Sequence, residues 1–202
     1  MRCAWKLRRP DMQMARFFSP VHTLGPGSRV ALWTQGCGKK CPECTAPELQ
    51  PRRKELNIPE SVLARMITDA ARRNDCSGLT ISGGDPLEQP EALLSLLPLV
   101  RGTFEDILVY TGYTMEEIRA GAAGEEGAQC LKYIDVLIDG RYVPSLNDPS
   151  CTLRGSSNQK IWYLTRGREE RYAPYLSAGR KVENFIHQDH VVTVGIQDRE
   201  EE

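Results

Sequence analysis

Residues 29–44 read RVALWTQGCGKKCPEC, an apolar run that passes directly into a loop with three cysteines. The run Arg29–Thr34 has the apolar content of a buried strand. Cys37, Cys41 and Cys44 follow it with the spacing Cys-x3-Cys-x2-Cys. Glycine and proline residues among them favour a tight curl that turns the three sulfurs inward. The stretch therefore predicts a strand that carries a thiolate site at its carboxyl end.

The rest of the chain alternates strand-like and helix-like segments, which is typical of an α/β fold with a largely parallel sheet. Apolar residues recur at helical spacing over residues 59–73 and 91–100. Thr114 and Glu117 have the spacing of a capping box, which predicts a helix over residues 114–120. Strands are expected at residues 12–18, 29–34, 78–82, 106–110, 133–139 and 161–164.

Short motifs of polar residues and glycine follow directly after several of the expected strands. Besides the cysteine loop, they are Gly83-Gly84-Asp85, Thr111 with the glycine after it, and Asp139 with the glycine after it. Parallel strands end at one edge of a sheet, and α/β folds bind ligands along that edge. We therefore expect these residues to contribute to a single site.

Composition narrows the class of protein. The 202 residues fit one globular domain, and 26 basic against 27 acidic residues give a net charge of -1, which offers no general attraction to nucleic acid or anionic membrane. No apolar stretch approaches the roughly 20 residues that span a bilayer. Residues 1–11 resemble a loose leader without the apolar run of a signal peptide. We expect a cytoplasmic protein without nucleic-acid or membrane partners.

The chain has seven cysteines, and an odd number argues against a disulfide framework. Three local thiolates suit two kinds of metal site. A structural zinc ion needs four ligands, so a zinc knuckle would have to be closed by His22, Cys3 or another distant residue. A [4Fe-4S] cluster held by three cysteines leaves one iron open to a substrate. The spacing alone leaves open a non-enzymatic zinc or iron–sulfur binding module.

Six motifs occur in order over residues 12–165. They are Gly25-Pro26-Gly27-Ser28-Arg29, the cysteine loop from Gly36 to Cys44, Ser82-Gly83-Gly84-Asp85-Pro86-Leu87, Tyr110-Thr111-Gly112-Tyr113, residues 135–142 and residues 153–159. In this order the chain resembles the radical S-adenosylmethionine (SAM) superfamily and, within it, the activating proteins of anaerobic ribonucleoside-triphosphate reductases.

The resemblance implies a fold and a domain organisation. Residues 12–165 would form a partial (β/α) barrel of largely parallel strands, the radical SAM core domain. Residues 166–202 lie beyond the resemblance and are expected to form a small C-terminal extension. In it, the apolar patterns of residues 181–186 and 191–196 predict a β-hairpin or two add-on strands, and we expect the acidic tail to be disordered.

The resemblance also implies the roles of site residues. Cys37, Cys41 and Cys44 would hold a [4Fe-4S] cluster, with SAM on the fourth iron. Cofactor-binding residues would be Gly83, Gly84, Asp85, Thr111, Asp139, Arg141 and Asn158. Gly83-Gly84-Asp85 matches the strand-end motif that receives the methionine amino group. Two glycines let the backbone approach the ligand closely, and a carboxylate can pair with an ammonium. Arg141 would pair with the methionine carboxylate, with a surface salt bridge as the competing interpretation.

The function implied is reductive cleavage of SAM to a 5'-deoxyadenosyl radical that abstracts a hydrogen atom. The reactivity would come from the cofactors, so no side chain is expected to be catalytic itself. The implied substrate is a glycine in the large subunit of the anaerobic ribonucleotide reductase, with an electron donor such as flavodoxin or ferredoxin. The alternative is a radical SAM enzyme that acts on a different protein, peptide or small molecule.

Overall fold

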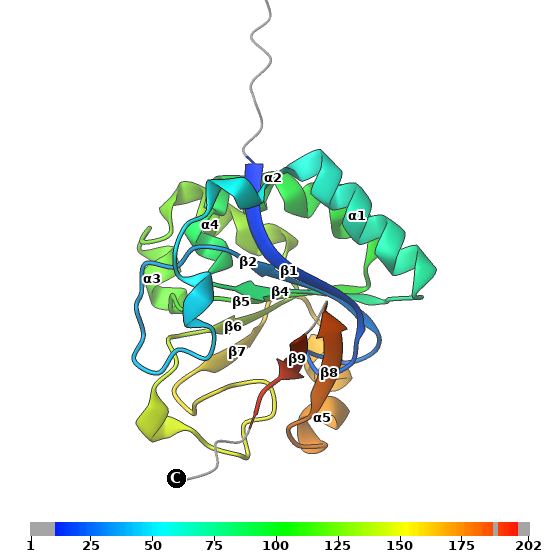
Figure 1. Cartoon of the computed structure of the whole chain (residues 1–202). Helices are drawn as coiled ribbons and strands as arrows, with labels where there is room; N and C mark the ends of the chain where they lie inside the picture. The colour runs from blue at the N-terminus through cyan, green and yellow to red at the C-terminus, as the bar shows by residue number, and fades with distance from the viewer. Residues whose placement is uncertain (1–10, 188–189, 198–202) are drawn as a thin grey trace, which may run out of the picture.

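The computed structural model describes residues 11–187 and 190–197, and Figure 1 shows them built around one central sheet. This sheet has seven strands in the order β3-β1-β2-β4-β5-β6-β7. The strands are β1 (Asp11–Val21), β2 (Arg29–Thr34), β3 (Asn57–Pro59), β4 (Gly78–Gly83), β5 (Asp106–Tyr110), β6 (Val136–Asp139) and β7 (Lys160–Tyr163).

The centre of the sheet is parallel. Strands β2, β4, β5 and β6 pair in parallel with their neighbours, whereas β1, β3 and β7 pair antiparallel at the flanks. The predicted α/β class is therefore confirmed, with the parallel strands at the centre. Because β2, β4, β5 and β6 run in the same direction, their carboxyl ends share one edge.

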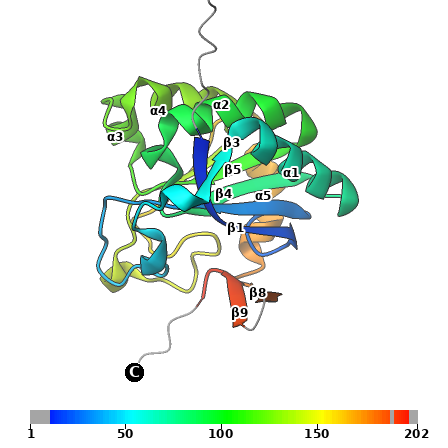
Figure 2. The same cartoon turned by 45° about the horizontal axis from the view of Figure 1, so that its top comes forward.

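Two layers cover the sheet, as Figures 1 and 2 show. The helices α1 (Glu60–Arg73), α2 (Pro90–Val100), α3 (Met115–Arg119) and α4 (Gly124–Cys130) lie on one face. The opposite face carries α5 (Arg168–Ser177) and a separate hairpin of β8 (Val182–His187) and β9 (His190–Gly195). The acidic residues 198–202 and residues 1–10 of the expected leader lie outside the described residues.

Alternation along the strands explains the two layers. In β5, Ile107 and Val109 belong to the core beneath the helices, whereas Leu108 packs in a second cluster with Tyr172 of α5. All four side chains are fully buried, and burial of an aliphatic or aromatic side chain typically contributes about 1.5–3 kcal/mol. Both faces of the sheet therefore carry apolar side chains, and each face is buried by a layer of packed elements.

The predicted capping box is confirmed at the start of α3. The Glu117 N–H donates to Thr114 Oγ1 at 3.1 Å, and the Thr114 N–H donates to Glu117 Oε2 at 2.8 Å. The box places the amino end of α3 beside the loop that follows β5. The helices α4 and α5 and the short strand β3 were not predicted.

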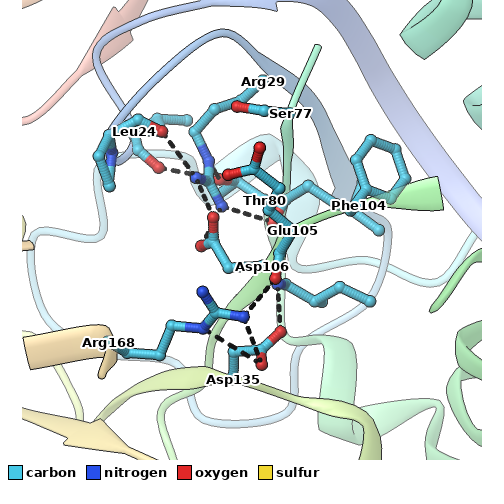
Figure 3. Close-up of polar contacts among 12 residues, drawn as sticks. Leu24, Arg29, Ser77, Thr80, Phe104, Glu105, Asp106, Asp135 and Arg168 are labelled. Atoms are coloured by element: carbon cyan, nitrogen blue, oxygen red, sulfur yellow. Dashed lines mark hydrogen bonds and ion pairs between the residues drawn. The ribbon is translucent and has the colours of Figure 1, made fainter. Parts of the chain in front are cut away.

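A buried ionic network joins β2, β5 and α5 (Figure 3). Arg29 Nη2 donates to Asp106 Oδ2 at 3.0 Å, and neither side chain is exposed to solvent. Arg29 Nε also donates to Thr80 Oγ1 at 2.6 Å, and the Tyr172 hydroxyl donates to Asp106 Oδ2. The network fixes α5 against the sheet face opposite the other helices.

Candidate cofactor site

The cysteine loop begins at the carboxyl end of β2, and backbone hydrogen bonds close its base. The Gly36 N–H donates to the Leu49 carbonyl at 2.7 Å, and the Cys37 N–H donates to the Gln50 carbonyl at 2.9 Å. These contacts close a loop between residues 36 and 50 that holds all three clustered cysteines. The strand therefore delivers the loop to the sheet edge as predicted.

The thiols of Cys37, Cys41 and Cys44 are free and half-buried. Burial raises the pKa of the Cys37 thiol, and the backbone N–H of Lys39 partly offsets that rise. Across residues 11–187 and 190–197, no three His, Cys, Asp or Glu side chains converge closely enough for one metal ion. Each cysteine of a cubane binds its own iron, so the three thiols of this loop can supply the ligands of three irons in a [4Fe-4S] cluster, whereas a structural zinc ion would need a fourth ligand.

The zinc alternative that His22 would complete is wrong. Val21 pairs with Arg29 at the amino end of β2, so His22 lies at the opposite end of that strand from Cys37. Its ring Nδ1 is 2.9 Å from Glu183 Oε1. Cys3, the other suggested ligand, lies outside the described residues.

The Gly83-Gly84-Asp85 motif packs directly against the base of the cysteine loop. A Cβ atom on Gly84 would lie 2.5 Å from the Gly36 carbonyl oxygen, which leaves no room for a side chain. Gly83 has a φ of 126°, which glycine tolerates far better than other residues. The Asp85 N–H donates to the Gly36 carbonyl at 3.0 Å. The two glycines therefore allow the cysteine loop and the Asp85 carboxylate to lie next to each other.

The Asp85 carboxylate joins the ends of β4 and β5. Its oxygens accept the Thr111 hydroxyl and the Gly112 N–H, each at 2.9 Å, and also the Leu87 N–H at 2.9 Å. Only 1% of this side chain is exposed. The structure thus brings together two of the predicted site residues, Asp85 and Thr111.

Lys39, between the first two cysteines, was missed as a site residue. Its ammonium lies 2.7 Å from Asp85 Oδ2, 3.3 Å from Glu88 Oε1 and 3.3 Å from the centre of the Tyr113 ring. Burial acts to lower the pKa of Lys39, but Asp85, Tyr113 and Glu88 raise it, and the net pKa lies above its usual value. In this structure the Lys39 ammonium therefore already pairs with the Asp85 carboxylate.

Asp139 is the last residue of β6, and both oxygens of its carboxylate accept hydrogen bonds. Its Oδ2 accepts the Met115 N–H and the Trp162 indole N–H, both at 2.7 Å, and its Oδ1 accepts the Lys160 N–H at 3.1 Å. These bonds tie the end of β6 to α3 and β7. Asp139 therefore supports the loop that follows it.

Arg141 and Asn158 lie together beyond Asp139. Asn158 Nδ2 donates to the Arg141 carbonyl at 2.9 Å, and the Arg141 guanidinium is 3.6 Å from Glu117 Oε1. About half of the Arg141 side chain is exposed. The contacts of these two residues join neither of them to Asp85 or Thr111.

A pocket of about 470 Å³ lies beneath the carboxyl ends of the central strands. Trp33, Ser82 and Tyr110 line it from β2, β4 and β5, and strand alternation turns them to the face opposite the helices α1–α4. Thr45, next to Cys44, also lines the pocket. The pocket is therefore continuous with the cysteine loop.

Comparison with known proteins agrees with this geometry. The sequence model of the 4Fe-4S single cluster domain family matches residues 23–162, which include the cysteine loop and the central strands. The class is therefore that of proteins with a single [4Fe-4S] cluster.

Individual relatives narrow this class. The anaerobic ribonucleoside-triphosphate reductase-activating protein of Pasteurella multocida (strain Pm70) is 37% identical over 161 residues, which cover 77% of this chain and 99% of that relative. Those of Escherichia coli (strain K12) and Enterobacteria phage T4 are 34% and 36% identical, over 69% and 71% of this chain and 91% and 88% of each relative. The chain belongs to the family of anaerobic ribonucleoside-triphosphate reductase-activating proteins.

Family membership confirms the predicted resemblance. With it, the chain is a radical SAM enzyme whose cofactors are a [4Fe-4S] cluster and SAM. In the part of the chain that the structure describes, no helix has the length and apolar character needed to cross a bilayer.

Proposed function

We propose that this protein activates an anaerobic ribonucleoside-triphosphate reductase by generating a glycyl radical on its large subunit. The observation that carries the proposal is the placement of the three-cysteine loop directly against Gly83-Gly84-Asp85 at one sheet edge. The names of the relatives support the reductase as partner, because the aligned region spans nearly the whole Pasteurella protein. Flavodoxin or ferredoxin is the proposed electron donor, and the cytoplasm the proposed location.

In this proposal each group of residues has a separate role. Cys37, Cys41 and Cys44 hold the cluster. The cluster and SAM, once bound, supply reductive cleavage and hydrogen-atom abstraction. The Asp85 carboxylate, held by Thr111, binds the amino group of SAM, and the two preceding glycines let the backbone approach it.

Three further residues are proposed to bind or support SAM. Asp139 holds the end of β6 in place, and Arg141 and Asn158 extend from the adjoining loops. The Arg141 guanidinium leaves its long contact with Glu117 to pair with the methionine carboxylate. We further propose that residues 12–165 form the core domain and curve as a partial barrel, with residues 166–202 as its extension.

The function is tested in two stages under anaerobic conditions. The protein is reconstituted with iron and sulfide, reduced with dithionite and assayed for 5'-deoxyadenosine from SAM. The reductase is then added, and electron paramagnetic resonance (EPR) is recorded for a glycyl radical. Formation of both signals supports the proposal. Release of 5'-deoxyadenosine without a radical on the reductase would point instead to another protein, peptide or small-molecule substrate.

Lys39→Met is expected to tighten SAM binding several-fold, because the Lys39 ammonium competes with the methionine amino group for Asp85. Methionine keeps an apolar stem, which in Lys39 packs against Gly112. The measurement is the dissociation constant of SAM for the reconstituted protein by calorimetry. Lys40→Met, an exposed neighbour on the same loop, is the matched control. Weaker SAM binding by the Lys39 variant would show that the ammonium assists the site rather than competing for it.

A further inference from the structure

The segment that follows the family match is firmly attached to the core. The match ends at residue 162, and α5 begins at Arg168. Tyr172 of α5 is fully buried against the sheet, and Arg168 Nε lies 3.4 Å from the Asp135 carboxylate. Figure 3 shows Arg168 directed toward Asp135 beside the Arg29–Asp106 pair. The segment thus packs as part of the same body.

Arg180 fixes the chain between α5 and β8. Its Nη2 donates to the Asp148 carbonyl at 2.7 Å, to Asn147 Oδ1 at 3.0 Å and to the Arg154 carbonyl at 3.1 Å. Its Nη1 donates to the Gln197 carbonyl at 3.1 Å, just beyond β9. One guanidinium therefore links the loop before β7 to the chain on both sides of the hairpin.

The hairpin is also held against β1. The Phe185 and Phe18 rings stack with their centres 4.7 Å apart, and the Thr23 hydroxyl donates to the Val194 carbonyl at 3.0 Å. Val194 is 3% exposed. Side chains of β8 and β9 therefore contact the core near the pocket.

This position makes the hairpin one side of the pocket. The described residues that line it from the hairpin are Val192, Thr193, Val194, Gly195, Ile196 and Gln197. Trp33, Ser82 and Tyr110 line it from the strand ends. The pocket therefore lies between the family core and a segment outside the family match.

Size and charge indicate what the pocket can accept. About 470 Å³ is the volume of a small-ligand site, so a protein substrate can insert only a single short chain segment. Arg16 is the one charged residue among the described lining residues, and its guanidinium pairs with Glu48. The remaining surface is apolar or neutral, which favours an uncharged segment.

We propose that β9 and residues 196–197 form a wall of the substrate pocket and select the uncharged, extended segment of the partner reductase that reaches the cofactors. This inference rests on the proposed function, because the partner is the reductase. The wall makes access depend on a part of the chain that the family match does not include.

The test places a positive charge on the wall. Val192→Lys and Gln197→Lys are compared with Val191→Lys, whose side chain is 63% exposed on the neighbouring position of the same strand. Gln197 is exposed, so its variant tests the wall even if Val192→Lys folds poorly. Glycyl radical formation is followed by EPR over a range of reductase concentrations, and SAM cleavage is measured in parallel without reductase.

The two wall variants are expected to raise the reductase concentration for half-maximal activation about tenfold, because the charge must be desolvated when the segment enters. The maximal rate is expected to be largely recovered at high reductase concentration, and Val191→Lys is expected to behave as wild type. An equal response of all three variants, or a loss confined to SAM cleavage, would overturn the inference. Failure of the proposed function would show instead in the wild type, as cleavage without any glycyl radical.

Discussion

Cys41→Ala is expected to abolish cluster binding and to lower 5'-deoxyadenosine formation by more than about 100-fold. The middle cysteine of the loop is one of only three proposed protein ligands, and its loss leaves two irons without a protein ligand. Mutation of a residue that only hydrogen-bonds to a metal ligand typically lowers metal affinity or activity about 10–100-fold. Loss of a ligand itself is therefore expected to have a larger effect. The measurements are iron content, the EPR spectrum of the reduced protein, and 5'-deoxyadenosine released from SAM.

Cys130→Ala is the matched control for this result. Cys130 is fully buried beside α2, where its Sγ lies 3.7 Å from the Pro90 carbonyl, and it lacks cluster-like spacing. Its variant is expected to bind iron and cleave SAM as the wild type does. Wild-type iron content and cleavage in Cys41→Ala would contradict the assignment of the cysteine loop.

The cysteine loop and the Gly83-Gly84-Asp85 motif could be placed from the sequence because each signal is local. A strand must end where its apolar run stops, and parallel strands bring their ends to one edge. That geometry accounts for the contact between Asp85 and Thr111, which are 26 residues apart. Local pattern and chain direction were sufficient for this part of the site.

Contacts that depend on tertiary packing could not be predicted in this way. Lys39 reads as one residue of a basic pair, and only the folded loop turns it toward Asp85. The helix α5 contains Pro174, which weakens the helical signal, yet the burial of Tyr172 stabilises it. The hairpin β8–β9 follows the strand pattern, but its position beside the pocket depends on Arg180 and the loop before β7.

Asp106→Ala is expected to lower the free energy of unfolding by about 3–5 kcal/mol, because it leaves the fully buried Arg29 guanidinium without its carboxylate. The Tyr172 hydroxyl also loses its acceptor, so α5 loosens together with β5. Urea unfolding followed by circular dichroism measures the change.

Glu105→Ala is the control for that loss, since the carboxylate next in sequence is 59% exposed and pairs with Arg171 at the surface. An exposed pair typically contributes no more than about 1 kcal/mol, so this variant should remain near the wild type. Equal destabilisation by the two variants would show that burial of the Arg29–Asp106 pair does not determine stability. If Asp106→Ala lowers the free energy of unfolding more than Glu105→Ala does, it should also activate the reductase less well. The reason is that the Arg29–Asp106–Tyr172 network holds α5, and α5 leads into the hairpin that contains β9.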